Sequence, residues 1–189
     1  MMEPWQIRAV HSATTLAAQA HDGQNRDDVS IPYIVHPARV AGLVVVFGGQ
    51  YQEIIAAWLH DVIENCRHGE TTVAYGLSSL KLPGDDAITI YQIVKALTKD
   101  PAVEKEQQLQ DSLRRILMAP PGATLVKICD RLDNVLDIGS RKKDRKKYLQ
   151  ETETLLSMLF GRAVESGYTE AHEVLRVNML LAEKKLSES

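Results

Sequence analysis

The chain has 189 residues, of which 44% are hydrophobic and 25% are charged, an ordinary balance for a globular protein. This length fits one domain with a sizeable core. Aromatic residues make up only 5%, and a net charge of −3 gives no electrostatic reason to expect nucleic acid as a partner. The two cysteines form neither a disulfide framework nor a zinc motif, so a reducing cytoplasm is the expected compartment.

The first residues lead directly into an amphipathic segment, and we therefore expect no signal peptide. The longest apolar run, residues 41–47, is far too short to cross a bilayer, so we expect no membrane partner. The pattern leaves the oligomeric state open, with a homo-oligomer among the alternatives.

Apolar residues recur at helical spacing along most of the chain, and Pro and Gly mark the interruptions. The spacing predicts nine helices, over residues 4–20, 37–47, 54–65, 71–80, 87–97, 104–118, 124–138, 144–166 and 169–186, the last two joined at Gly167. We see no internal repeat, low-complexity segment or convincing hairpin. The sequence therefore predicts an all-α fold, with residues 1–189 forming a single helical bundle.

The third predicted helix organises the rest of the chain. Its broad apolar stripe consists of Ile54, Ile55, Trp58, Leu59, Val62 and Ile63. It also carries His60, Asp61 and Glu64, and burying an unpaired carboxylate is costly. Two interpretations stay open: the three polar groups lie at the solvent-exposed margin of the helix, or a divalent cation between imidazole and carboxylate leaves Glu64 free for proton transfer.

The seventh predicted helix repeats this pattern. Asp130 lies among apolar residues, and Asn134 is one turn further along the same face. Asp130 can simply cap a neighbouring helix or pair with Arg131, and Asp133 and Asp137 belong to other faces, where they can be solvated. Two apolar helices that each carry an acid at the edge of the core nevertheless suggest one shared site.

A further imidazole comes from His36, which the adjacent Pro37 holds in a rigid turn. Together with His60, Asp61 and Asp130 it makes a set of two nitrogen and two oxygen donors. Such a set suits Mn²⁺, Fe²⁺ or Zn²⁺ and leaves positions open for water and a phosphate.

Four separated blocks read AHxGQxR at residues 20–26, PYIxHPxxVA at 32–41, AAxLHDVIE at 56–64 and VKxxDRLxN at 126–134. In this order they resemble the hydrolase half of the RelA/SpoT alarmone enzymes, over about residues 13–160. The resemblance implies a helical bundle of the HD-domain type. Since little chain remains for a synthetase domain, the sequence is similar to the stand-alone small alarmone hydrolases.

The resemblance also implies roles for individual residues. It implies that one Mn²⁺, or another divalent transition metal, is bound by His36, His60, Asp61 and Asp130. Glu64 would orient or deprotonate the attacking water, Arg26 would pack on the guanine base, and Asn134 would contact the nucleoside. The implied reaction is hydrolysis of the 3′-pyrophosphate of ppGpp or pppGpp, which releases GDP or GTP and pyrophosphate.

Two departures from the family pattern bear on the substrate side. The family typically has Glu-Asp where this chain has Glu64 and Asn65, so we place Asn65 in the catalytic pair although an amide cannot accept a proton at neutral pH. Asp27 and Asp28 stand where the family has a cation, which predicts weaker binding of a polyanion or a different nucleotide preference. The alternatives are therefore an HD-family phosphatase acting on another nucleotide such as NADPH, or a catalytically impaired nucleotide-binding relative.

A basic run at residues 141–147 follows the seventh predicted helix. Most of its side chains fit a solvated helix start. One or two of them can face the phosphates of an anionic substrate.

Overall fold

The computed structural model describes residues 2–26, 30–140 and 144–188. Its helices are α1 (Pro4–Ala20), α2 (Val35–Val46), α3 (Tyr51–Leu59), α4 (Val62–Asn65), α5 (Gly69–Ser79), α6 (Asp86–Leu97), α7 (Gln108–Met118), α8 (Gly122–Leu136), the 3₁₀ helix η1 (Ile138–Ser140), α9 (Arg145–Glu165) and α10 (Thr169–Ser187). Within these ranges the extended pairing is one isolated bridge between Asn25 and Pro32. The predicted all-α fold is confirmed.

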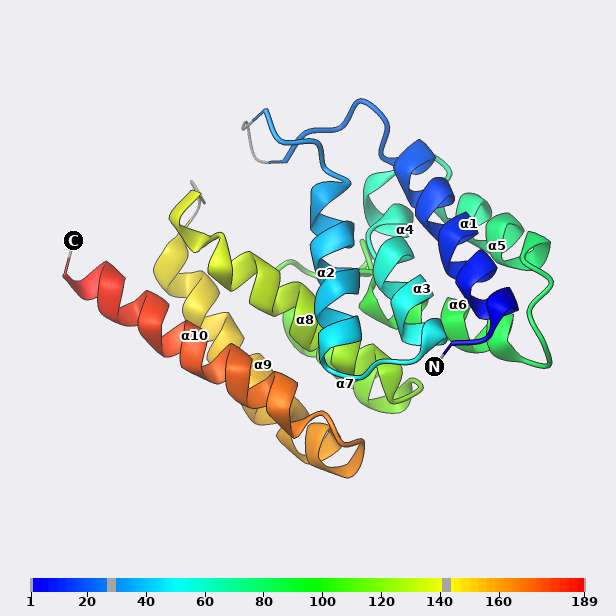
Figure 1. Ribbon diagram of the computed structural model, residues 1–189. Coiled ribbons are helices and arrows are strands. Elements are labelled where there is room, and N and C mark those ends of the chain that lie inside the picture. Colours follow the sequence, from blue (N-terminus) through cyan, green and yellow to red (C-terminus); the bar gives the residue numbers. More distant parts are fainter. Residues whose placement is uncertain (1, 27–29, 141–143, 189) are drawn as a thin grey trace.

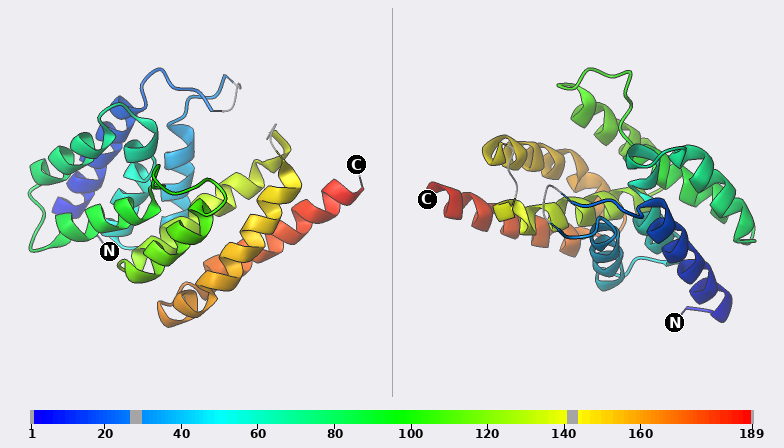
Figure 2. Two further views of the ribbon diagram at one scale, coloured as in Figure 1. Left: turned by 180° about the vertical axis from the view of Figure 1, so that it is seen from behind. Right: turned by 90° about the horizontal axis from the view of Figure 1, so that it is seen from above.

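Helix α3 lies at the centre of the bundle and packs against α1, α2, α6 and α8 (Figure 1). Helix α8 packs against α2 and α3 on one side and against α9 and α10 on the other. The long helices α9 and α10 run antiparallel, on the opposite side of α8 from α1 and α5 (Figure 2). Fully buried side chains of the two central helices include Ile55, Leu59, Leu125 and Ile128.

The helix predicted over residues 54–65 is interrupted at its His-Asp pair. It begins earlier, at Tyr51, because Gln50 and Glu53 form a capping box, with Glu53 Oε2 accepting from the Gln50 amide at 2.8 Å. It ends at Leu59, where His60 Nδ1 lies 2.8 Å from the Ala57 carbonyl. In a continuing helix that carbonyl would accept from the Asp61 amide, so the imidazole competes with the next helical hydrogen bond. His60 and Asp61 therefore occupy a turn between α3 and α4.

Other predicted boundaries also shift. Helix α7 begins at Gln108 instead of residue 104, because residues 104–107 form a turn in which the Glu104 carbonyl accepts from the Gln107 amide at 2.8 Å. Helix α8 covers Gly122–Leu136, and η1 follows it. The predicted junction at Gly167 is confirmed: its φ of 78° is a left-handed conformation that favours glycine, and α10 begins two residues later.

A helix that crosses a bilayer has to be apolar over about 20 residues. None of the helices in the described part of the chain is both long and apolar enough.

Gly69 sets the approach of α5 to α4. A Cβ atom at this position would press on the carbonyl oxygen of Val62 and lie 2.8 Å from the Cα of Ile63. Because both neighbours are backbone atoms, they cannot move aside as a flexible side chain would. Helix α5 begins at Gly69, two residues before the predicted start, and the absence of a side chain there lets α4 and α5 meet.

We predict that Gly69→Ala destabilises the protein by about 1–3 kcal/mol, because the added methyl group overpacks the contact between α4 and α5. Denaturant unfolding measures the change. The control is Gly42→Ala on α2, where an added Cβ would meet nothing within 4 Å. That control should be neutral or stabilising by up to about 1 kcal/mol, and equal stability of the two variants would contradict the packing argument.

Candidate metal centre

Two buried imidazoles face each other at the junction of α2 and α3. His36 is 3% exposed and His60 is 4% exposed, and their ring centroids are 5.2 Å apart. His60 Nδ1 donates to the Ala57 carbonyl, an oxygen that can only accept. His36 Nδ1 lies 2.7 Å from the carboxylate oxygen Oδ2 of Asp133. In the neutral form of each ring these bonds place the proton on Nδ1 and leave Nε2 as the nitrogen whose lone pair can bind a cation.

Two carboxylates approach these Nε2 atoms. Asp61 Oδ2 lies 3.6 Å from His36 Nε2 and 3.4 Å from His60 Nε2. Asp130 Oδ1, from α8, lies 3.3 Å and 3.9 Å from the same two atoms. The ligand atoms offered by His36, His60 and Asp130 all lie within 4.8 Å of one another. The four predicted ligands therefore come together from three separate segments.

The donor set fits a divalent cation. His60 Nε2 is buried and has no hydrogen-bond partner among the described residues, so a lone pair points into the cluster unused. Burial alone would lower the pKa of His36, but hydrogen bonds to Asp130 and Asp133 outweigh it and raise that pKa to about 9. Burial likewise opposes ionisation of Asp130, yet Lys127 and His36 hold its pKa well below the usual range. The cluster thus favours positive charge where the Nε2 atoms meet the carboxylates.

The sequence places Asp133 on a face that can be solvated, and this interpretation is wrong. Asp133 is only 3% exposed, and its carboxylate accepts a hydrogen bond from His36 Nδ1. Its Oδ2 also accepts from Arg26 Nη1 at 2.8 Å, and these partners overcome the effect of burial and lower its pKa. Asp130 and Asp133 are three residues apart on α8, so both reach the side facing α2. That spacing is the signal by which the sequence could have revealed Asp133.

Arg26 and Asn134, the predicted substrate-binding pair, contact each other. Arg26 Nη2 donates to Asn134 Oδ1 at 2.6 Å, and Asn134 Nδ2 donates to Asp130 Oδ1 at 2.8 Å. Arg26 also lies 3.4 Å from Asp137, which accepts from Arg39 at 2.8 Å, so Asp137 is paired although its side chain is 36% exposed. The side chain predicted to pack on a base is therefore held against α8.

Asp130 does not pair with Arg131, which was one alternative. Its Oδ2 accepts from Lys127 Nζ at 2.9 Å. Arg131 instead lies over the ring of Tyr148, 4.2 Å from its centroid. Asp130 can consequently direct its other oxygen towards the imidazoles.

Tyr33 belongs to the site, although sequence reasoning did not single it out. Its hydroxyl donates to Asp61 Oδ2 at 2.6 Å, and the Asn65 amide donates to that hydroxyl at 2.9 Å. Burial and the negative charge of Asp61 raise the pKa of Tyr33, so the hydroxyl keeps its proton. The signal was its position three residues before His36, inside the second matched block.

Glu64 lies apart from the imidazoles in its contacts. Its Oε1 is 2.6 Å from Lys99 Nζ, and its Oε2 accepts from the Lys99 amide at 3.2 Å. Lys99 follows the end of α6, and no pattern in the sequence indicates that it meets α4. The catalytic roles predicted for Glu64 and Asn65 stay predictions.

Parts of two predicted features, Asp27 with Asp28 and residues 141–143 of the basic run, lie outside the described residues. In the rest of the basic run, Arg145 donates to the Gly139 carbonyl at 2.8 Å, and Asp144 caps α9 by accepting from the Lys147 amide at 3.0 Å. These contacts agree with a helix start.

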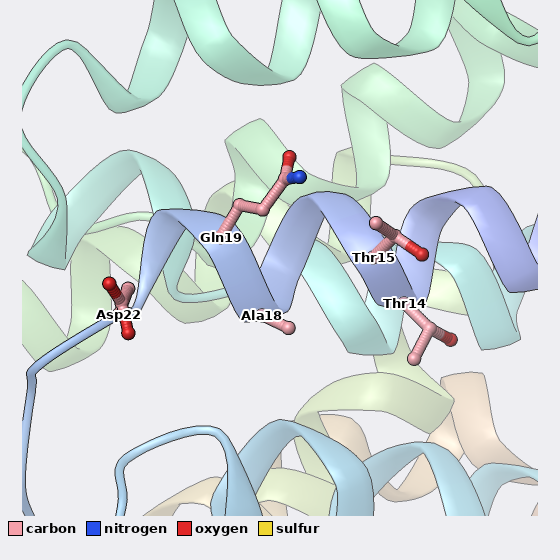
Figure 3. Close-up of a pocket in the computed structure, with 5 residues that line it drawn as sticks. All are labelled: Thr14, Thr15, Ala18, Gln19 and Asp22. Atoms are coloured by element: carbon pink, nitrogen blue, oxygen red, sulfur yellow. The ribbon is translucent and has the colours of Figure 1, made fainter.

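A separate surface pocket lies along α1 and the turn after it (Figure 3), lined by Thr14, Thr15, Ala18, Gln19 and Asp22. None of the predicted site residues lines it. Its side chains also lack the imidazoles and paired carboxylates of the His-Asp cluster. We therefore place the candidate site at the His-Asp cluster.

Comparison with known proteins identifies the family of this chain. A family model described as an HD domain matches residues 13–163. The bifunctional (p)ppGpp synthase/hydrolase SpoT of Escherichia coli K12 is 31% identical over 161 residues, 83% of this chain and 22% of SpoT. The guanosine-3′,5′-bis(diphosphate) 3′-pyrophosphohydrolase of Aquifex aeolicus is 28% identical over 163 residues, 84% of this chain and 22% of that protein. The chain thus spans about a fifth of the length of these relatives.

A solved structure, described as a metazoan ortholog of SpoT that hydrolyzes ppGpp and plays a role in starvation responses, has the same fold. Its TM-score is 0.70 at 21% identity, over 98% of this chain and 97% of the other. An HD domain implies dependence on a divalent metal, and His36, His60 and Asp130 form a group that can hold one. Because the family model covers most of the sequence, including the whole His-Asp cluster, this chain belongs to the HD domain family.

Proposed function

We propose that this chain is a metal-dependent hydrolase that removes the 3′-pyrophosphate of ppGpp or pppGpp and releases GDP or GTP and pyrophosphate. The observation that carries the proposal is the meeting of two Nε2 lone pairs and two carboxylates in one buried cluster. The names of the relatives, several of them guanosine-3′,5′-bis(diphosphate) 3′-pyrophosphohydrolases, support this substrate over other phosphate esters.

In this proposal the cation is Mn²⁺, and its ligands are His36, His60, Asp61 and Asp130. An equal mixture of imidazole and carboxylate donors suits Mn²⁺, which accepts both and favours oxygen more than softer metals do. When bound, such a cation polarises a phosphoryl oxygen and lowers the pKa of a coordinated water.

The protein's own groups would orient the site and move the proton. The Nδ1 bonds of His36 and His60 hold both rings with Nε2 facing inwards. Glu64 is the proposed proton acceptor, because Asn65 offers only an amide in the same turn. The carboxylate of Glu64 is paired with Lys99, so a phosphate of the substrate would compete for the Lys99 ammonium group and release Glu64.

Substrate recognition would fall to Arg26 and Asn134. Arg26 presents a planar guanidinium suited to stacking on a base, and Asn134 presents an amide suited to the nucleoside. Both are held by α8, which links recognition of the nucleoside to the ligand Asp130.

We predict that wild-type protein with Mn²⁺ releases pyrophosphate from ppGpp, and that Asp61→Asn lowers kcat/KM by more than about 100-fold, because an amide is a poor metal ligand. The matched control is Glu173→Gln in an exposed pair with Arg176 on α10, which should retain full activity. If the wild-type protein does not turn over saturating ppGpp in the presence of Mn²⁺, the proposed function is rejected.

Asp133→Asn should weaken Mn²⁺ binding by about 10-fold or more, because it removes the charge that makes His36 a stronger donor. Titration calorimetry on metal-free protein measures the dissociation constant. Asp137→Asn is the matched control, since Asp137 touches Arg26 and Arg39 but is 36% exposed and does not contact His36 in the described contacts. If both variants bind Mn²⁺ equally well, Asp133 has no role in positioning the ligand.

A side-by-side assay of ppGpp, pppGpp and NADPH with Mn²⁺ should rank the two alarmones above NADPH in kcat/KM. The expected difference is at least about tenfold, the effect of about 1.4 kcal/mol in transition-state binding. NADPH as the best substrate would assign the chain to the alternative HD phosphatase activity. Binding of all three without turnover would mark it as an impaired relative.

A further inference from the structure

We propose that Asn65 and Tyr33 form a directed hydrogen-bond relay that positions Asp61, and that Asn65 serves this relay instead of proton transfer. The inference rests on the metal site of the proposed function, since Asp61 is one of its ligands. It assigns a positioning role to two residues that touch no reacting atom in the proposal.

The relay follows from three contacts. Asn65 Nδ2 lies 2.9 Å from the Tyr33 hydroxyl, and that hydroxyl lies 2.6 Å from Asp61 Oδ2. Asp61 Oδ2 is the oxygen that faces both Nε2 atoms, at 3.6 Å from His36 and 3.4 Å from His60. The Tyr33 hydroxyl therefore acts on the ligand atom itself.

The protons that each group carries determine which group donates and which accepts in the two hydrogen bonds of the relay. An ionised carboxylate only accepts hydrogen bonds, and a tyrosine hydroxyl carries one proton. The short contact to Asp61 takes that proton, so the second partner of the Tyr33 oxygen has to be a donor. Asn65 supplies an N–H group, and an aspartate at this position would supply another acceptor. The amide is thus the residue type that lets Tyr33 donate to Asp61 without competition.

The surrounding contacts hold both members of the relay. The ring of Tyr33 stacks on His21 at a centroid distance of 4.8 Å and an interplanar angle of 25°. Gln24 joins the two sides, with its Oε1 2.8 Å from His21 Nδ1 and its Nε2 donating to the Asn65 carbonyl at 3.0 Å. His21 is only 2% exposed. The loop after α1 therefore fixes the Tyr33 ring and the Asn65 backbone together.

The first test measures the Mn²⁺ dissociation constant of metal-free protein by calorimetry. Tyr33→Phe removes the hydroxyl and keeps the ring that stacks on His21. We expect it to weaken Mn²⁺ binding by about 10- to 100-fold, the usual effect of removing a partner of a metal ligand. An unchanged constant would overturn the relay.

The second test is a double-mutant cycle that separates the relay from charge. Asn65→Asp adds a negative charge near the cation, which favours binding equally with Tyr or Phe at position 33. With Tyr33 present, the new carboxylate also competes with Asp61 for the hydroxyl proton. We therefore expect the effect of Asn65→Asp on the Mn²⁺ dissociation constant to be at least about threefold less favourable with Tyr33 than with Phe at that position.

Asn65→Ala is the matched control, because it removes the donor without adding an acceptor. Its cycle with Tyr33→Phe should show less coupling than the Asn65→Asp cycle. Unfolding of each metal-free variant by denaturant checks that the fold is retained, and a loss of stability alone would not produce coupling in metal affinity. Equal effects of Asn65→Asp in both backgrounds would overturn the proposal.

These outcomes are distinct from failure of the proposed function. Mn²⁺ binding with the expected coupling, together with intact ppGpp, would support the relay and reject the substrate. Rapid ppGpp hydrolysis with no coupling would support the function and reject the relay. Wild-type protein that binds no Mn²⁺ would reject both.

Discussion

Two buried imidazoles, each held from behind by a hydrogen bond, set the geometry of the candidate site. In each ring Nδ1 donates a hydrogen bond to an acceptor on the side away from the cluster. This acceptor is the Ala57 carbonyl for His60 and the Asp133 carboxylate for His36. Their Nε2 atoms consequently face the same space, which Asp61 and Asp130 border with negative charge. The same bond from His60 ends α3 and so places Asp61 in the turn that follows. One hydrogen bond thus shapes both a helix end and the His-Asp cluster.

Each carboxylate in this cluster is held from a different part of the chain. Tyr33, ahead of α2, donates to Asp61, whereas Lys127 and Asn134 donate to Asp130 from its own helix. Burying these acids would be costly without such partners, because a desolvated charge needs compensation. The network therefore orients the oxygens and lowers the cost of keeping them buried, which prepares them for a cation.

The side that would receive a substrate is engaged in internal contacts. Lys99 holds Glu64, and α8 side chains hold the guanidinium of Arg26. Under the proposed function, a polyanionic nucleotide would exchange these partners for its own phosphates and base. Nucleotide binding and the readiness of Glu64 for proton transfer would then be coupled, because the ammonium group of Lys99 that attracts a phosphate also restrains Glu64.

Local patterns in the sequence predict the helical class, the two central helices and the junction at Gly167, and they suggest the four residues that meet at the cluster. Apolar spacing and residue chemistry carry these features without knowledge of neighbours. The packing of the helices settles which partners these side chains meet: Asp133 lies behind His36, Tyr33 bonds Asp61, and Lys99 pairs with Glu64. Each of these contacts joins segments from 28 to 97 residues apart. Periodicity along one helix cannot specify which side chain of another helix it will meet, because that depends on how the helices pack.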